Sequence, residues 1–100
     1  MIYITQLIHI NQGQEATFDE FESFAIPIIA KYNGKLELRI RPPETAMIES
    51  SMEQPYETHL VSFPKENDFE QFMADPERQK YLHLKAQSIR SSVLIKGTKL

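Results

Sequence analysis

The residues best suited to chemistry are His59 and Glu57, which stand two positions apart in an alternating segment, residues 56–63. Side chains two positions apart on a β-strand point the same way, so we expect the imidazole and the carboxylate to lie side by side. A carboxylate beside an imidazole fixes the tautomer of the ring and raises its basicity, as a general base requires. The pair therefore indicates acid–base catalysis. The alternative is a half-buried polar pair at a subunit interface.

A second candidate group is the charged face of residues 35–41, where Arg39 and Arg41 alternate with apolar residues. Guanidinium groups bind carboxylates and enolates through paired hydrogen bonds, so the two arginines are candidates to clamp an anionic group. The alternative is that they form ion pairs with Glu37, Glu57 or a partner subunit.

Tyr3 and His9 lie on the first alternating segment and are further candidates for ligand contacts. Tyr3 could donate to a ligand oxygen or simply fill space, and His9 could line a cavity mouth or be a solvated strand end. His83 stands among polar neighbours and is expected to face solvent. The three histidines lack the helical spacing of four that metal sites use, so we expect neither a metal nor a cofactor.

Composition limits the range of functions. One hundred residues fit a single domain, 1–100, and a chain of this size buries so little surface that dimerisation is a natural way to hide more. The absence of cysteine excludes disulfides, thiolate catalysis and structural zinc, and a net charge of −3 gives no reason to expect nucleic acid. There is no signal peptide pattern and no apolar run near the ~20 residues that span a bilayer, which predicts a cytoplasmic protein without a membrane partner.

Four strands and three helices must position these candidates. Period-two alternation predicts strands over 2–10, 35–41, 56–63 and 92–96. Apolar residues at steps of three and four predict a helix over 18–32, which Pro27 should kink and Asn33-Gly34 should end. Further helices are expected after Pro64 and after Asp75-Pro76, the latter running to Ile89. The long connection 44–55 is expected to be a lid or an edge ornament.

The order strand, helix, strand, strand, helices, strand predicts an α+β protein with the ferredoxin-like βαββαβ fold. Both helical segments should cover one face of a four-stranded antiparallel sheet whose central strands are the first and third. We expect the bare face to carry these residues: Tyr3, Thr5, Leu7, His9, Glu37, Arg39, Arg41, Glu57, His59 and Val61. A second copy would cover this mixed face and enclose a cavity, which predicts a homodimer. Alternatively, Val61 and Phe63 face the helices, which takes Glu57 and His59 out of that cavity.

Three motifs carry a family resemblance: Ser62-Phe63-Pro64 followed by Phe69, then Asp75-Pro76-Glu77 with Gln79, and the segment 29–36 with its Tyr-Asn-Gly stop. Over nearly the whole chain these resemble the small uncharacterised proteins of the dimeric α+β barrel superfamily. The resemblance implies a ferredoxin-like dimer. The superfamily also holds cofactor-independent quinol monooxygenases, haem-degrading enzymes, lactone isomerases and chlorite-detoxifying haem proteins, so it implies no single reaction.

Two functions from different classes follow. In the first, the protein is a small enzyme that acts without a cofactor on an activated carbonyl, enol or quinol compound, in a monooxygenase-like or isomerase-like reaction. His59 accepts the proton, Glu57 orients it and Arg39 stabilises negative charge, while Tyr3, His9 and Arg41 contact the ligand. In the second, the protein only binds a small organic molecule or serves as an assembly module.

Overall fold

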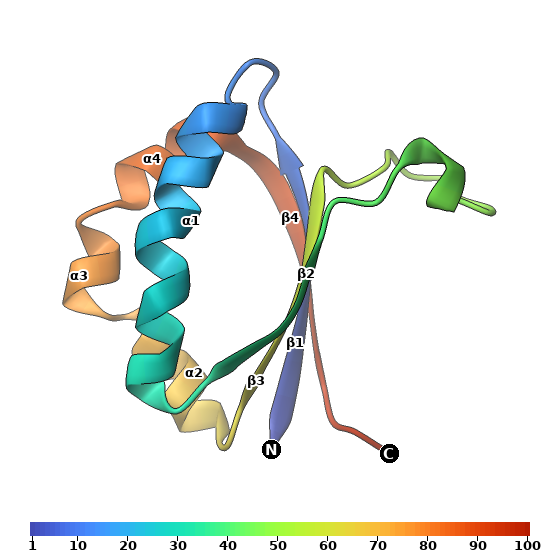
Figure 1. Cartoon of the computed structure of the whole chain (residues 1–100). Helices are drawn as coiled ribbons and strands as arrows, with labels where there is room; N and C mark the ends of the chain where they lie inside the picture. The colour runs from blue at the N-terminus through green and yellow to red at the C-terminus, as the bar shows by residue number, and fades with distance from the viewer.

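The computed structural model describes residues 1–100 and has the predicted α+β architecture. In chain order the elements are β1 (Ile2–Ile10), α1 (Glu15–Ile29), β2 (Lys35–Ile40), β3 (Glu57–Phe63), α2 (Glu66–Met73), α3 (Pro76–Gln79), α4 (Leu82–Ser88) and β4 (Ile89–Gly97). Short 3₁₀ helices occupy Ala30–Tyr32 and Glu44–Ala46. The four strands form one antiparallel sheet, and all four α-helices lie on one side of it (Figure 1). The ferredoxin-like prediction is confirmed.

The strand order is β2-β3-β1-β4, so the first and third strands are central, as predicted. β1 pairs with β3 in a register that sets Ile4 opposite Val61, and Gln6 opposite His59. Residues that face each other across an antiparallel pair share one side of the sheet. Because Ile4 is buried against the helices, His59 must lie on the helix side as well.

α1 forms because its apolar residues recur every three or four positions and all meet the sheet. Phe18, Phe21, Ala25 and Ile28 are each at most 5% exposed. The helix runs through Pro27 to Ile29, and Asn33 then adopts a left-handed conformation with φ of 63°. The predicted Asn-Gly stop is confirmed.

The predicted single helix from Asp75 to Ile89 is wrong. The chain forms two short helices, α3 and α4, and Ile89 already belongs to β4, which pairs it with Ile10. The strand is longer than predicted because pairing with β1 outweighs the helical preference of this segment. Asp75 does cap α3 as predicted, since its side chain accepts a hydrogen bond of 2.9 Å from the Arg78 backbone N–H.

The first expectation, that Glu57, His59, Arg39 and Arg41 lie on the bare face, is also wrong. For β3 the alternative is correct, because Val61 and Phe63 face the helices. Glu57 and His59 stand opposite the helix-facing Ile8 and Gln6. On β2, an irregularity between Leu36 and Leu38 inserts one extra residue, which reverses the alternation that the sequence suggests. All four candidates therefore face the helices.

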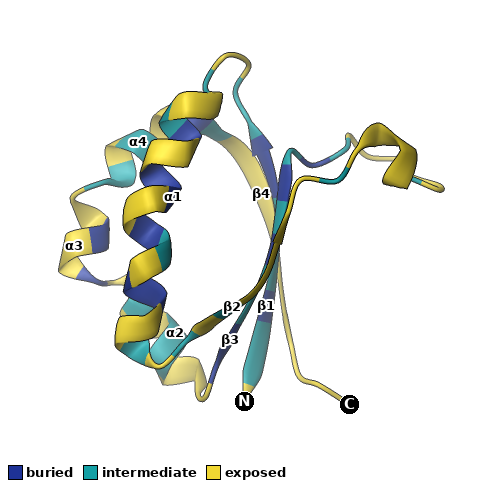
Figure 2. Cartoon of the chain, viewed as in Figure 1, coloured by how far each residue is buried: buried dark blue, intermediate teal, exposed yellow.

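The bare face is correspondingly more apolar than predicted. Leu38 and Ile40 on β2 and Val93 and Ile95 on β4 are 41% to 53% exposed. Figure 2 shows the exposed colour along much of β2 and β4. The connection between β2 and β3 projects away from the helices, beyond one end of the sheet (Figure 1). No helix has the length and apolar character needed to cross a membrane.

Candidate functional site

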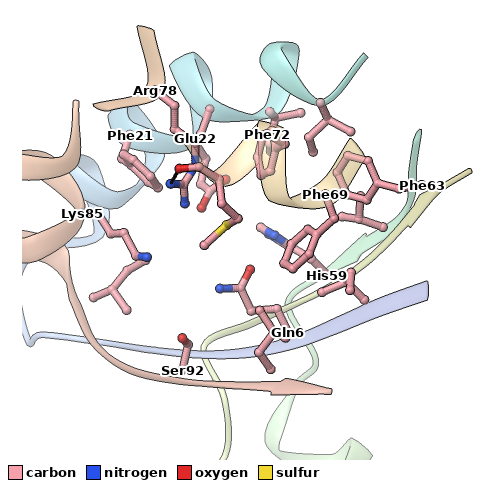
Figure 3. Close-up of a pocket in the computed structure, with 18 residues that line it drawn as sticks. Gln6, Phe21, Glu22, His59, Phe63, Phe69, Phe72, Arg78, Lys85 and Ser92 are labelled. Carbon is pink, nitrogen blue, oxygen red and sulfur yellow. Dashed lines mark hydrogen bonds between the residues drawn. The ribbon is translucent and has the colours of Figure 1, made fainter. Parts of the chain in front are cut away.

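A cavity of about 270 Å³ lies between the helices and the sheet of a single chain. Most of its lining is apolar, and six polar side chains from six different helices and strands interrupt that lining (Figure 3). The polar residues are Gln6, Glu22, His59, Arg78, Lys85 and Ser92. The sequence predicted a cavity between the sheets of two subunits. His59 instead lines this cavity within one chain.

His59 and Glu57 are in contact, as their spacing predicts. The Nε2 atom of His59 is hydrogen-bonded to the Glu57 carboxylate, and the two residues are 4% and 1% exposed. An ionised carboxylate only accepts, so Nε2 is assigned the proton and donates. In the neutral ring Nδ1 then carries the lone pair, and the hydrogen bond to Glu57 leaves this atom unused.

Glu57 is held from its other side by two arginines. Arg39 donates to it from Nε at 2.8 Å and Arg41 donates from Nε at 2.7 Å. Asp19 on α1 forms a further ion pair with Arg41. Burial alone would raise the pKa of Glu57, but the hydrogen bonds from His59, Arg39 and Arg41 outweigh burial and hold that pKa at about 2. Glu57 is therefore ionised at neutral pH.

Arg39 and Arg41 do not line the cavity. Their guanidinium groups pair with Glu57, and that of Arg41 also lies 4.9 Å from the centroid of the Tyr56 ring. Of the two interpretations drawn from the sequence, the structure favours the ion pairs over the ligand clamp. Both arginines are linked to His59 through the Glu57 carboxylate, which accepts hydrogen bonds from all three side chains.

Tyr3 and His9 are separated from the others. Tyr3 faces the bare side of the sheet, beside Glu37 and Leu60. His9 is 6% exposed, and its Nε2 lies 3.0 Å from the carbonyl oxygen of Glu53 in the 44–55 connection. The structure thus groups His59, Glu57, Arg39 and Arg41, and places Tyr3 and His9 elsewhere. The roles proposed for all six residues stay predictions.

Sequence reasoning missed Glu22, which is 7% exposed and lines the cavity. Burial raises the pKa of its carboxyl, and a protonated His59 would act in the opposite direction. A signal was present, because Glu22 stands within the apolar stripe of α1, four positions after Phe18 and three before Ala25. A carboxylate on the buried side of a helix requires a reason.

Two cations were missed as well. Arg78 of α3 is 7% exposed, and Lys85 of α4 is half-buried on the wall of the cavity. Burial lowers the pKa of each side chain, and the charge of Arg78 lowers the pKa of Lys85 further. Both fall on the apolar side of their segment, at the spacing 78, 82, 85 and 89. That spacing was the available signal.

The site has no cluster of three or more His, Cys, Asp or Glu side chains that could hold a metal ion. The groups available for chemistry are the His59 imidazole with its bound carboxylate, the Glu22 carboxyl group of raised pKa, and two cations. These groups can accept a proton, donate a proton and stabilise negative charge.

No protein-family model and no curated protein matches the chain. Its fold does match solved structures. A protein of unknown function from Rhodopseudomonas palustris gives a TM-score of 0.83 at 14% identity, over 99% of this chain and 82% of that chain. A dimeric ferredoxin-like protein of unknown function from Jannaschia sp. CCS1 gives 0.72 at 14% identity, over 98% of both chains.

A DABB family protein with a ferredoxin-like fold from Mesorhizobium loti gives 0.67 at 12% identity, over 99% of this chain and 96% of that chain. The ferredoxin-like fold that the resemblance implies is thus confirmed. Identities this low show the fold alone, and the chemistry must be argued from the site.

Proposed function

We propose that the protein binds a small organic molecule in the cavity between sheet and helices and catalyses a proton transfer on it. The observation that carries this proposal is the pairing of His59 with Glu57 at the wall of a largely apolar cavity. A concave apolar space with a few convergent polar groups is the usual form of a small-molecule site.

The proposed reaction is isomerase-like. Nδ1 of His59 takes a proton from a carbon next to a carbonyl group, and the electron pair of the broken C–H bond moves onto the carbonyl to give an enolate. The ionised Glu57 stabilises the imidazolium that results and keeps the ring oriented. Where a further double bond is conjugated with the enolate, return of the proton to the far carbon of that system completes the isomerisation; return to the same carbon gives exchange with solvent.

Glu22 is the proposed proton donor to the developing enolate oxygen. Its raised pKa keeps a proton on the carboxyl at higher pH than an exposed glutamate would, whereas Glu57 stays ionised. Two carboxyl groups with opposite pKa shifts in one site are a common arrangement for assigning the acid and base roles.

Deuterium exchange tests the proposal. Phenylacetone and phenylpyruvate both have an activated benzylic carbon, and its exchange in D₂O can be followed by proton NMR. We expect enzyme-dependent exchange that falls at least about 100-fold in His59→Gln, the lower end of what a general base contributes. His83→Gln is the matched control, because His83 is exposed and does not line the cavity.

If His59→Gln remains folded and exchanges either ketone as fast as the unaltered protein, the proposal is wrong. If a ligand raises the melting temperature and neither ketone exchanges, the second function applies, in which the protein only binds small molecules.

We also propose that the chain forms a homodimer through the bare face of its sheet. The exposed apolar side chains of β2 and β4 support this, as does the described dimeric state of the Jannaschia protein. A patch of this kind is covered in most soluble proteins, and a twofold pairing of identical faces is the simplest closed cover.

A further inference from the structure

Three charged side chains enter the cavity from three different helices. Glu22 comes from α1, Arg78 from α3 and Lys85 from α4, as Figure 3 shows. None of the three takes part in a salt bridge, whereas eight ion pairs between Lys or Arg and Asp or Glu form elsewhere in the chain. Glu22 and Arg78 are buried and Lys85 is half-buried. A buried charge without an ionic partner is costly, so the convergence of these groups indicates a ligand that supplies the missing partner.

Arg78 has an unsatisfied donor. Its Nε is buried and without a hydrogen-bond partner, while its terminal Nη1 donates to the Met73 carbonyl oxygen at 3.3 Å. An unsatisfied buried donor costs about 1–3 kcal/mol. The hydrogen bond to Met73 holds the guanidinium at the cavity wall, where its remaining terminal donors can bind an acceptor of a bound molecule.

The charged groups around the cavity indicate the charge of the ligand. Two cations face one carboxyl group, and the raised pKa of Glu22 makes that carboxyl a weak counter-ion. A bound anion would supply the missing negative charge, and would restore the pKa values of Arg78 and Lys85 that burial lowers.

The apolar part of the lining indicates the chemical character of the rest of the ligand. Four phenylalanine rings, Phe21, Phe63, Phe69 and Phe72, surround the same space. Stacked and edge-on aromatic contacts favour a planar or apolar group. At about 270 Å³ the cavity suits a ligand with a single ring or a short chain.

We infer that the ligand is an apolar-bodied organic acid whose carboxylate is bound by Arg78 and Lys85. This inference rests on the proposed function, and it assigns the substrate class: a carbonyl compound with a carboxylate on one side of the activated carbon and an apolar group on the other. In this arrangement Arg78 and Lys85 select the acid, while His59 and Glu22 act on it.

Binding is tested with phenylacetate and its neutral isostere phenylacetamide, measured by calorimetry and by the shift in melting temperature. We expect phenylacetate to bind at millimolar concentration or below, and the amide to bind at least about tenfold more weakly, because hydrogen bonds to charged groups are worth about 1.5–3 kcal/mol. Lys85→Met keeps the apolar stem and should remove most of the preference. Lys80→Met is the control, since Lys80 is exposed and outside the cavity.

Arg78→Lys and Arg78→Gln extend the test. The lysine variant should keep part of the preference and the glutamine variant should lose it, and if Arg78→Gln fails to fold, Lys85→Met still decides. The inference is overturned if phenylacetate does not bind at millimolar concentration, if the amide binds equally well, or if Lys85→Met leaves phenylacetate binding unchanged.

A comparison of phenylacetone with phenylpyruvate distinguishes failure of the acid preference from failure of the proton transfer. If phenylacetone exchanges as fast as phenylpyruvate, the acid preference is wrong while the proton transfer stands. If phenylacetate binds in preference to its amide and neither ketone exchanges, the proton transfer is wrong while the anion site stands.

Discussion

Glu57 binds Nε2 of His59 with the same carboxylate that receives Nε of Arg39. The carboxylate is 1% exposed and links a cavity-lining imidazole to two arginines outside the cavity. One side chain therefore orients the candidate base and balances the charge behind it. Its removal should affect both stability and chemistry.

Glu57→Gln removes the negative charge and leaves Arg39 and Arg41 with Asp19 as their remaining ionic partner. We expect a loss of about 1–2 kcal/mol in the free energy of unfolding, because both arginines keep access to solvent and can be rehydrated. Ketone exchange should fall as well, since the amide no longer stabilises the imidazolium. Urea unfolding at pH 7, alongside the exchange assay, measures both effects.

Acid should weaken the native protein through the same residue. The pKa of Glu57 is about 2 in the fold and starts from an ordinary 4.5, so its contribution is fully present above pH 4.5 and is lost as the pH falls toward about 2. Urea unfolding between pH 6 and pH 2.5 measures this loss. The slope should be smaller in Glu57→Gln, and an equal slope in both proteins would contradict the assignment.

Glu22 should behave in the opposite sense. Burial raises its pKa in the fold, so its ionisation costs stability as the pH rises above the ordinary value of 4.5 and through the raised pKa. Glu22→Gln should therefore be more stable at pH 7, with a melting temperature a few degrees higher, since about 1 kcal/mol corresponds to roughly 4–8 °C in a domain of this size. The same variant should exchange both ketones more slowly.

Glu20→Gln provides the control for this stability gain, because Glu20 lies on the exposed side of α1. Its melting temperature should stay close to that of the unaltered protein. A melting temperature of Glu22→Gln at or below the unaltered value would show that the carboxylate is stabilised by its surroundings.

The order of elements was predictable from the sequence because it depends on local patterns. Period-two alternation, the stripe on α1 and the Asn33-Gly34 stop act over a few residues, and each was confirmed. The facing of the strands was not predictable in the same way. One extra residue between Leu36 and Leu38 moves the following side chains of β2 to the opposite face of the sheet. No residue type at that point of the sequence indicates the irregularity.

The candidate site was predictable only in part for a related reason. His59 and Glu57 are neighbours on one strand, so their contact follows from spacing. Glu22, Arg78 and Lys85 come from three helices and meet only through tertiary packing. Polar residues on the apolar side of a helix were the signal that the sequence offered.

Dimerisation can be tested on the bare face of the sheet. Val93→Lys with Ile95→Lys places two charges where we propose that a second copy packs, and both positions are more than 40% exposed in the single chain. We expect the double variant to sediment as a monomer at micromolar concentration, where the unaltered chain sediments as a dimer.

Ile48→Lys is the matched control, because Ile48 is fully exposed and lies in the 44–55 connection. It should leave the dimer intact. A double variant that remains dimeric and folded would place the interface elsewhere, and an unaltered chain that sediments as a monomer would remove the dimer altogether.

Gly34 ends the first helical segment at a point where no side chain fits. A Cβ atom there would lie 2.6 Å from Cε1 of Phe63 and 2.7 Å from Cγ2 of Ile29, both within the buried core. Gly34→Ala should cost about 1–3 kcal/mol, as overpacking of a close-packed core does. Gly97→Ala is the control, since no atom lies within 4 Å of its Cβ position. Because the Phe63 ring also lines the cavity, Gly34→Ala should weaken phenylacetate binding, and a fully stable variant with unchanged binding would show that the ring can move aside.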